Sequence, residues 1–356
     1  MNRSTETLLA AFAEGHTAAL ARVVSIVENR RPDSDSILAA LHPRVGRARR
    51  IGITGPPGAG KSTLTALMAR DYRQAGYKIG IVCVDPTSPF TGGALLGDRV
   101  RMEQVALDEN VFIRSMATRG SLGGLAATTR EVTDVFDAFG FDRIIVETVG
   151  VGQSELDVAR TADSTVVVLV PESGDSIQTL KAGVMEIADI FVVNKSDRPG
   201  ADRLRNDIEL MLGLRRGINY GSVPAHHGID LKRAMNPARV AREASRDDKA
   251  DTWTPPVLRV VAARDEGTTE LIESLDRHFS YLETSGALRE KRRQRLMERV
   301  IDAVDRRMRL RLWTDGEANR WLEARIPELE SGATTPYSVA DELLAAHGHL
   351  VTRAED

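Results

Sequence analysis

The chain has few of the features that would tie it to an oxidising compartment or to nucleic acid. Cys83 is the only cysteine in 356 residues, so an intramolecular disulfide and a cysteine-based metal cage are both excluded. Lys and Arg number 48 against 51 Asp and Glu, which gives a formal net charge of −3 and no overall attraction to nucleic acid or anionic lipid. These absences favour a protein of the reducing cytoplasm.

Long hydrophobic runs are also missing. Runs such as 165–170 and 190–193 have the length of a strand and are far too short to cross a bilayer. Residues 1–14 include Glu6 and Glu14 and lack the apolar core and small-residue cleavage site of a signal peptide. We therefore expect no membrane span, no export, and neither a membrane nor a nucleic acid as partner.

From residue 50 onward, short apolar runs alternate with helical segments. The runs are apolar at consecutive positions, which is typical of strands buried on both faces of a parallel sheet, and the helical segments supply the crossovers. The pattern predicts an α/β fold with a doubly wound, mostly parallel sheet. The expected strands are 51–54, 79–84, 111–113, 143–147, 165–170, 190–193 and 257–261, and the expected crossover helices are 62–74, 124–139 and 177–187.

Helical segments flank this core. Residues 5–29 repeat apolar side chains with a period near 3.6, which predicts one amphipathic helix ahead of the sheet. A long charged helix is expected over 288–313, and it carries one apolar stripe that must pack against another surface. The stripe consists of Met297, Ile301, Val304, Met308 and Leu312.

The chain is therefore predicted to have three parts. The first is an N-terminal helical extension over 1–48. The second is the α/β domain over 49–283, interrupted by an irregular insertion over about 199–256. The third is a C-terminal helical arm over 284–356.

The most specific motif is the sequence Gly55-Pro56-Pro57-Gly58-Ala59-Gly60-Lys61-Ser62, which matches the P-loop pattern G-x-x-x-x-G-K-[ST] in full, between an expected strand and an expected helix. Its backbone N–H groups are expected to surround phosphate oxygens. Lys61 is expected to reach the β- and γ-phosphates and to act in catalysis, while the Ser62 hydroxyl would bind Mg²⁺. The predicted phosphate-binding residues are Gly55, Pro57, Gly58, Ala59, Gly60, Lys61, Ser62 and Thr63.

A second motif, Asn194-Lys195-Ser196-Asp197, follows the expected strand 190–193. The Asp197 carboxylate can accept hydrogen bonds from the N1–H and 2-amino groups of guanine. Adenine has neither group, and leaving a buried partner unpaired costs about 1–3 kcal/mol or more. Asn194, Lys195 and Asp197 are therefore predicted to bind the base and to select GTP over ATP.

A third motif, Glu147-Thr148-Val149-Gly150, follows the expected strand 143–147. An acidic side chain there lies near Mg²⁺, and the Gly150 N–H can contact the γ-phosphate. Gln153 could orient the attacking water, although a surface polar residue is an equal alternative. Asp85 and Asp98 could approach Mg²⁺ or its waters, or could simply be solvated loop acids.

Three further patterns admit more than one interpretation. Residues 174–181 start a predicted helix after the strand 165–170, and they are either a ligand loop at the carboxyl edge of the sheet or a capped helix start. His226 and His227 lack a third ligand, so a loop pair is favoured over a metal site. The basic residues 289–295 are favoured as a solvated helix face over a nucleic-acid patch.

Taken together, these motifs resemble the MeaB/ArgK family, which are P-loop GTPase chaperones of adenosylcobalamin-dependent acyl-CoA mutases, in a class that also includes nickel-insertion metallochaperones. The likeness covers most of the chain. The stretch Glu147-Thr148-Val149-Gly150-Val151-Gly152-Gln153 is specific to the family, whereas the P-loop is not. The matching segments are 52–62, 84–88, 91–98, 146–155 and 194–197.

The resemblance implies roles that spacing does not show. Asp85, Asp98 and Glu147 would be the acidic residues of the Mg²⁺ site. The loop 172–183 would be a third switch that couples the nucleotide state to the mutase, and the C-terminal helix would form a homodimer. The coupling residues in that loop would be Asp175, Gln178 and Lys181.

Two departures from the family pattern stand out. The insertion is long, and Val261-Ala262-Ala263 stands where many members have Ser-Gly-Leu. The backbone of these three residues could still contact the guanine O6, but a side-chain contact could not survive. The partner could therefore be an acyl-CoA mutase other than methylmalonyl-CoA mutase.

The sequence thus predicts a P-loop NTPase fold and a cytoplasmic, Mg²⁺-dependent GTPase that converts GTP to GDP and phosphate. Hydrolysis is expected to be slow alone, because no arginine finger is evident, and to be stimulated by the mutase whose cofactor loading or protection it gates. The alternatives are an ATP-dependent kinase or transport ATPase, a nickel-type metallochaperone GTPase, and a non-hydrolysing interaction module.

Overall fold

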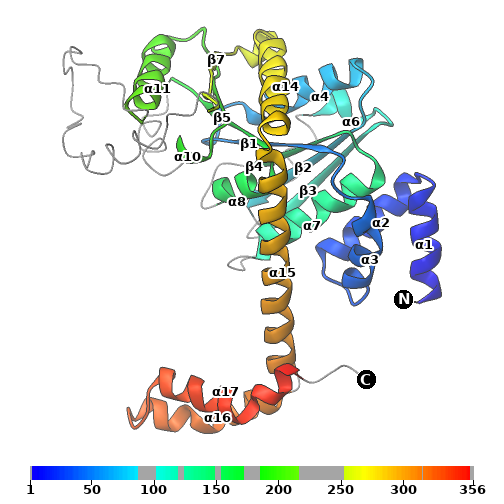
Figure 1. Ribbon diagram of the computed structural model, residues 1–356, viewed down its shortest axis with the longest axis vertical. Helices are drawn as coiled ribbons and strands as arrows, with labels where there is room; N and C mark the ends of the chain where they lie inside the picture. Colours follow the sequence, from blue (N-terminus) through cyan, green and yellow to red (C-terminus); the bar gives the residue numbers. More distant parts are fainter. Residues whose placement is uncertain are drawn as a thin grey trace. The chain divides into compact units, whose positions relative to one another are not determined.

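The computed structural model describes residues 2–86, 102–118, 124–148, 154–171, 185–215, 252–314 and 316–352. The chain divides into two compact units, Met1–Arg289 and Glu290–Asp356 (Figure 1). Each unit is described separately below.

A seven-stranded sheet forms the centre of the first unit, with the strand order β3-β2-β4-β1-β5-β6-β7 and every neighbouring pair parallel. The α/β prediction is therefore confirmed. β7 is shorter than expected, because Val261 leaves the ladder to form a bridge with Glu266. The strands are β1 (Arg49–Thr54), β2 (Ile79–Pro86), β3 (Val111–Thr118), β4 (Arg143–Thr148), β5 (Ser164–Leu169), β6 (Ile190–Val193) and β7 (Val257–Arg259).

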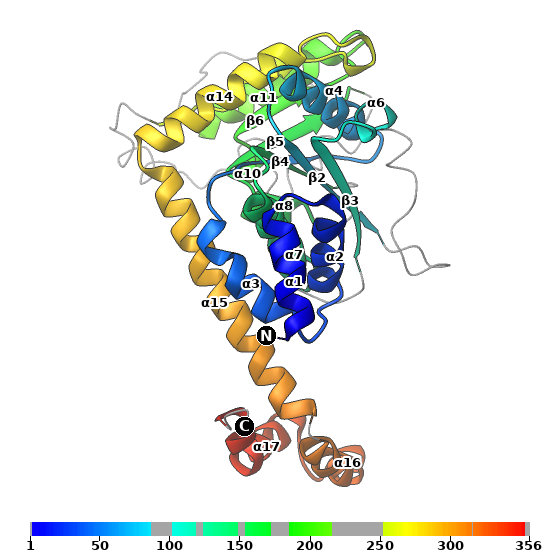
Figure 2. The same cartoon turned by 90° about the vertical axis from the view of Figure 1, so that its right-hand side faces the viewer.

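Helices cover both faces of the sheet, and Figures 1 and 2 show α4 and α14 on one side and α7 and α8 on the other. Among the described residues before 119, the helices are α1 (Arg3–Ala13), α2 (Thr17–Glu28), α3 (Ser34–Leu41), the 3₁₀ helix η1 (His42–Arg44), α4 (Lys61–Gln74) and α6 (Glu103–Ala106). Among those from 124 to 284, they are α7 (Gly124–Phe139), α8 (Ser154–Thr161), α10 (Met185–Ile187), α11 (Ala201–Arg215), the 3₁₀ helix η3 (Ala262–Arg264) and α14 (Thr268–Thr284).

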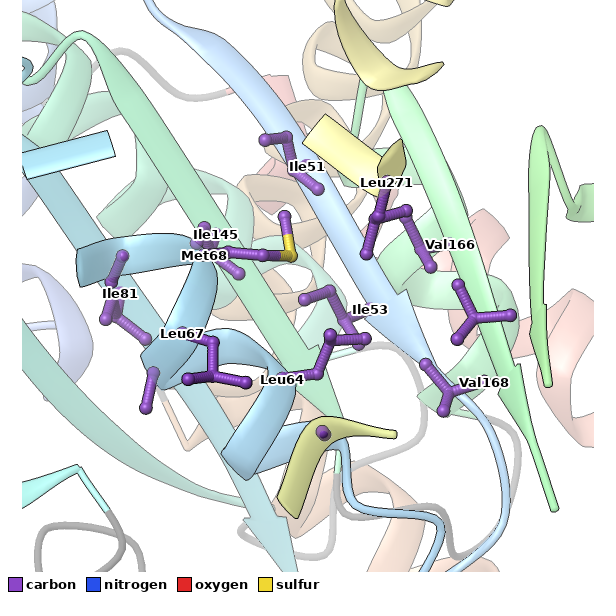
Figure 3. Packing of buried hydrophobic residues seen from close by; sticks show 14 of the residues in the cluster. Ile51, Ile53, Leu64, Leu67, Met68, Ile81, Ile145, Val166, Val168 and Leu271 are labelled. Atoms are coloured by element: carbon purple, nitrogen blue, oxygen red, sulfur yellow. The ribbon is translucent and has the colours of Figure 1, made fainter. Parts of the chain in front are cut away.

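The strands are apolar at consecutive positions because both faces of the sheet are buried. Along β1, Ile51 and Ile53 pack with Met68 of α4 and Leu271 of α14 in one core (Figure 3). A Cβ at Gly52 would point to the opposite face, where it would lie 2.6 Å from a side-chain carbon of Val158 in α8. Removing either layer would therefore expose apolar strand surface to water.

The N-terminal segment belongs to the core of the second face. Leu20 and Val24 of α2 pack in one cluster with Phe136 of α7, and Figure 2 shows α2 beside α7. The expected single helix over 5–29 is wrong. Gly15, at φ +86°, ends α1 in the left-handed region that glycine adopts without strain, and α2 begins two residues later.

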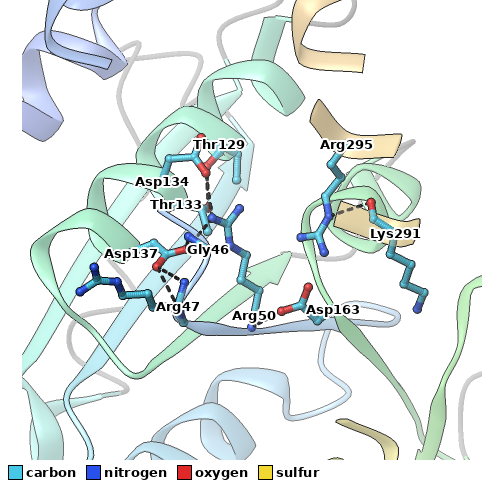
Figure 4. Close-up of polar contacts among 11 residues, drawn as sticks. Gly46, Arg47, Arg50, Thr129, Thr133, Asp134, Asp137, Asp163, Lys291 and Arg295 are labelled. Atoms are coloured by element: carbon cyan, nitrogen blue, oxygen red, sulfur yellow. Dashed lines mark hydrogen bonds and ion pairs between the residues drawn. The ribbon is translucent and has the colours of Figure 1, made fainter. Parts of the chain in front are cut away.

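A buried ionic cluster ties β1 to α7 (Figure 4). The Arg50 guanidinium donates to Asp134 at 2.8 Å and to Asp137 at 2.9 Å, and its backbone N–H donates to Asp163. Asp137 also accepts the Gly46 backbone N–H at 2.8 Å. Burial alone would lower the pKa of Arg50, but the surrounding carboxylates outweigh it and raise the pKa above its ordinary value.

The second unit is helical. It contains most of α15 (Ala287–Thr314) together with α16 (Glu317–Glu330) and α17 (Pro336–Thr352). Leu312 packs with Ala318 and Leu343 in a small core, whereas Met297, Ile301, Val304 and Met308 of the predicted stripe are between 45% and 59% exposed. Within the described part of the chain, no helix is long and apolar enough to span a membrane.

Candidate nucleotide site

The P-loop connects β1 to α4 at the carboxyl edge of the sheet. At Gly55, with φ +137°, a Cβ would lie 2.0 Å from the backbone oxygen of Val168 in β5. At Gly60, with φ +88°, a Cβ would lie 2.3 Å from Nδ2 of Asn194. Both glycines are therefore required by close approach of neighbouring segments as well as by backbone conformation.

Lys61 begins α4 and folds back over the P-loop. Its buried ammonium donates to the backbone oxygens of Gly55 at 2.8 Å and Pro56 at 2.9 Å. The positive charge is thus fixed beside a loop whose glycines allow close backbone approach. A polyphosphate held by the N–H groups of this loop would meet that charge directly.

The Ser62 hydroxyl and the Glu147 carboxylate meet beneath the P-loop. Ser62 Oγ donates to Glu147 Oε1 at 2.5 Å, and both residues are buried. The contact forms because β1 and β4 are neighbours, with Ile53 opposite Glu147 in the register. At the next position, Thr54 and Thr148 share a buried hydroxyl hydrogen bond of 3.1 Å.

These oxygens suit a hard divalent cation. Mg²⁺ usually keeps several waters and takes only one or two carboxylates besides phosphate oxygens. Among the described side chains, no three of His, Cys, Asp or Glu gather into a metal cage. Ser62 and Glu147 are two oxygens of the described residues that could hold Mg²⁺ at this place. Asp85 lies near the carboxyl end of β2, two positions beyond Cys83, which pairs with Glu147.

Asn194 connects three loops through one side chain. Its Nδ2 donates to the Ala59 backbone oxygen of the P-loop at 2.7 Å. Its Oδ1 accepts the backbone N–H groups of Lys195 at 2.8 Å and Ala262 at 3.1 Å. The sequence predicts Asn194 as a base-binding residue. The structure shows that its amide joins the loop that begins at Asn194 and the turn at Ala262 to the P-loop.

Asp197 follows in the same loop, which is anchored to β7. Ser196 donates from its backbone N–H and from its hydroxyl to the Val260 backbone oxygen, each at 3.1 Å. Lys195 adopts φ +55°, which turns the chain sharply here. The Asp197 side chain is 31% exposed and forms an ion pair with Arg264, Nη2 to Oδ2, at 3.2 Å.

The predicted residues Val261, Ala262 and Ala263 lie beside this loop, at η3. Ala262 is buried, and its N–H is directed to Asn194, while Ala263 is exposed next to it. The sequence motifs did not predict the ion pair that Arg264 forms with Asp197. The signal available was the position of Arg264 directly after the three predicted residues, in the charged run Arg264-Asp265-Glu266.

Several predicted site residues lie outside the described residues. These are Asp98, Gly150, Gln153, Asp175, Gln178 and Lys181, together with the side chain of Asp85 and residues 216–251 of the insertion. The structure brings the other members of the predicted site to one edge of the sheet. They are Gly55, Pro57, Gly58, Ala59, Gly60, Lys61, Ser62, Thr63, Glu147, Asn194, Lys195, Asp197, Val261, Ala262 and Ala263.

Comparison with known proteins bears on this site. The family model described as "Methylmalonyl Co-A mutase-associated GTPase MeaB" matches residues 20–317. The chain is 42% identical to a protein of Pyrococcus abyssi named as a GTPase, over 95% of both chains. It is 32% identical to the GTPase ArgK of Escherichia coli, over 91% of this chain and 90% of that one.

Two further relatives extend the comparison. The chain is 30% identical to the mouse protein named methylmalonic aciduria type A homolog, mitochondrial, over 97% of this chain and 80% of that one. The crystal structure of a LAO/AO transport system kinase superposes with a TM-score of 0.64 at 26% identity, covering 96% of this chain and 97% of that one. The relatives and the geometry agree on a GTP-hydrolysing enzyme, and this chain belongs to the MeaB family of GTPases.

Proposed function

We propose that this GTPase binds Mg²⁺–GTP at the carboxyl edge of the sheet and couples hydrolysis to an adenosylcobalamin-dependent acyl-CoA mutase. The observation that carries the nucleotide part is the convergence of three groups on one edge. These groups are the Lys61 ammonium, the Ser62–Glu147 oxygen pair and the loop of Asn194 and Asp197.

Hydrolysis on this site needs positioning and charge rather than a covalent intermediate. The P-loop amides and Lys61 hold the β- and γ-phosphates, so the γ-phosphoryl group is presented for attack by water. Ser62 and Glu147 would hold Mg²⁺, which when bound would supply positive charge that stabilises the phosphate oxygens. Gln153 is proposed to orient the water, with Gly150 contacting the γ-phosphate.

Guanine selection is assigned to Asp197. Its carboxylate accepts from the base N1–H and 2-amino group, while the backbone of Val261, Ala262 and Ala263 faces the O6 side. Support comes from Asn194, which joins the loop of Asp197 to both the P-loop and Ala262. GDP remains bound by the same base contacts after phosphate leaves.

The mutase partner is supported by the family description and by the name of the mouse relative. The proposed coupling segments are 85–98, 147–155 and 172–183. In the first segment, Asp85 and Asp98 would complete the metal site. In the third segment, the residues that would contact the partner are Asp175, Gln178 and Lys181. Loss of the γ-phosphate would relax these segments and so gate cofactor loading or protection.

A homodimer through the arm 284–356 is proposed on the exposed apolar side chains of α15, because two copies can cover each other's stripe.

The three-part division of the chain and a cytoplasmic setting complete the proposal. The N-terminal extension 1–48 shares its core with α7, so it would act as part of the GTPase domain.

The decisive experiment measures nucleotide binding and phosphate release with the purified chain, alone and with each candidate cobalamin mutase. We expect GDP and GTP to bind far more tightly than ADP and ATP, and the cognate mutase to accelerate phosphate release. Equal affinity for ATP would favour a kinase or transport ATPase. Stoichiometric nickel binding would favour a metallochaperone, and no phosphate release with any mutase would favour a non-hydrolysing module.

A further inference from the structure

The loop after β7 carries charged residues to which the function above gives no role. Arg264 Nη2 lies 3.2 Å from Oδ2 of Asp197. The next residue, Asp265, accepts from Nη2 of Arg70 in α4 at 2.6 Å. The loop is therefore tied both to the carboxylate assigned to guanine and to the helix that starts at the P-loop.

The backbone of this loop is fixed on both sides of Arg264. Ala262 donates to Asn194 Oδ1 at 3.1 Å, and Val261 and Glu266 form an antiparallel bridge. Arg264 itself donates its backbone N–H to the Val261 oxygen at 2.8 Å. Surface ion pairs are weak partly because two mobile side chains must be ordered. Here the backbone that carries Arg264 is ordered, so the starting point of its side chain is fixed relative to Asp197, and only the side chains themselves remain to be ordered.

The ion pair leaves acceptor positions on the carboxylate for a base. The Arg264 contact is made to Oδ2, and a carboxylate offers about four lone-pair positions on its two oxygens. A guanine base needs one acceptor position on each oxygen, for N1–H and for the 2-amino group. Arg264 and guanine can therefore share the Asp197 carboxylate, with Arg264 restricting its rotation.

We propose that Arg264 is a positioning residue that determines base specificity, by holding the Asp197 carboxylate in the plane that reads the N1–H and 2-amino groups of guanine together. The proposal rests on the proposed role of Asp197. Its consequence is selective: a rotated carboxylate can accept from one N–H but not from both together, so the affinity that the 2-amino group adds to the N1–H contact is lost. Inosine lacks that group, so GDP and IDP report the difference.

The test is the ratio of dissociation constants for IDP and GDP, measured by displacement of a fluorescent guanosine diphosphate from the full-length chain. For Arg264→Ala we expect the preference for GDP over IDP to fall about three- to tenfold, with the IDP affinity changed less than twofold. Arg264→Lys should restore most of the preference, because it keeps the charge. Thermal unfolding should be unchanged, since the Arg264 side chain is 60% exposed.

Arg70→Ala is the matched control. It removes a charged contact of the same loop without touching Asp197, so GDP and IDP should change together and their ratio should stay within twofold. An unchanged ratio in Arg264→Ala, or tighter GDP binding, would overturn the proposal. Tighter binding would show that Arg264 competes with guanine for the carboxylate.

Asp197→Asn separates this proposal from the proposed function beneath it. If Asp197 reads guanine, the variant should prefer XDP over GDP, and adding Arg264→Ala to it should have no further effect on base preference. If the wild-type chain instead binds GDP no better than ADP, the role of Asp197 fails and Arg264 fails with it. If Asp197→Asn switches to XDP while Arg264→Ala leaves the GDP-to-IDP ratio unchanged, only the role of Arg264 fails.

Discussion

Ser62 Oγ and Glu147 Oε1 lie 2.5 Å apart, although the two residues are far apart in the sequence and belong to different segments. Their contact depends on the sheet order, which places β4 directly beside the strand that leads into the P-loop. A hydroxyl and a carboxylate are thereby held together beside the phosphate-binding loop.

The first prediction concerns this oxygen pair. Glu147→Gln should raise the Mg²⁺ concentration needed for half-maximal GTP hydrolysis by at least about 10–100-fold, because even the loss of a group that only supports a metal ligand has an effect of that size. The measurement is a Mg²⁺ titration of phosphate release. Glu270→Gln, at an exposed position on α14, is the control and should behave as the wild type. Equal Mg²⁺ dependence in both variants would contradict the assignment.

Lys61→Ala should reduce the rate of GTP hydrolysis about 10²–10³-fold, because the transition state loses a fixed charge at the transferred phosphoryl group. Single-turnover phosphate release measures this rate. Lys78→Ala serves as control, because Lys78 is exposed just before β2, at the opposite edge of the sheet. A Lys61→Ala variant that keeps the wild-type rate would show that the ammonium has only a structural role.

Gly60 and Gly76 form a matched pair for testing the P-loop packing. Both have φ +88°, but a Cβ at residue 60 would lie 2.3 Å from Asn194 Nδ2, whereas nothing lies within 4 Å at residue 76. Gly76→Ala should cost only the backbone strain, about 1–3 kcal/mol in the free energy of unfolding. Gly60→Ala should cost more than Gly76→Ala and should also abolish tight GDP binding.

Chemical denaturation and nucleotide titration of both variants provide the comparison. The decisive result is GDP affinity. If Gly60→Ala bound GDP as tightly as Gly76→Ala, the contact between Asn194 and the P-loop would not matter for the site.

The buried cluster around Arg50 predicts a large effect on stability. Asp137→Ala removes a carboxylate that accepts from Arg50 and from the backbone of residues 46–48, and should lower the free energy of unfolding by about 3–5 kcal/mol. Asp276→Ala removes the exposed partner of Arg49 and should cost at most about 1 kcal/mol. Urea unfolding of both variants tests the contrast, and similar losses would count against it.

The proposed homodimer predicts that Ile301→Asp shifts the chain toward monomers. Ile301 is 57% exposed on α15, and in a symmetric contact each copy would place one charge against apolar surface. We expect the dimer dissociation constant to rise about tenfold or more, read by light scattering or sedimentation. GDP affinity should not change. A wild-type chain that is monomeric at all concentrations would contradict the arm's role.

The sheet and the P-loop were predictable because their signals are local. Consecutive apolar residues in 51–54 and 190–193 report burial on both faces, and the spacing from Gly55 to Ser62 is a complete motif. The break at Gly15 was missed because the apolar period continues through it. The hydrogen bonds of Arg50 to Asp134 and Asp137 were not predictable, because no local sequence pattern predicts a contact between a strand and a distant helix.

In the candidate site, too, some features were predictable from local sequence and others were not. Sequence motifs predicted Asn194 and Asp197 as base-binding residues, since both belong to one recognisable tetrapeptide after a strand. They could not show that the Asn194 amide is used to bind Ala59 and Ala262, because that depends on which loops the fold brings within reach. Arg264 belongs to no motif, and only its distance from Asp197 identifies it.

The three contacts of Asn194 make the lengths of three loops interdependent. The side chain is short, so the Ala59 oxygen and the Ala262 N–H must each stay within a few ångströms of one backbone position. A residue inserted into the P-loop or into the turn at 261–266 would pull one of these partners out of reach. Chimeras that exchange any one of these loops for a longer one would then need matched changes in the other two.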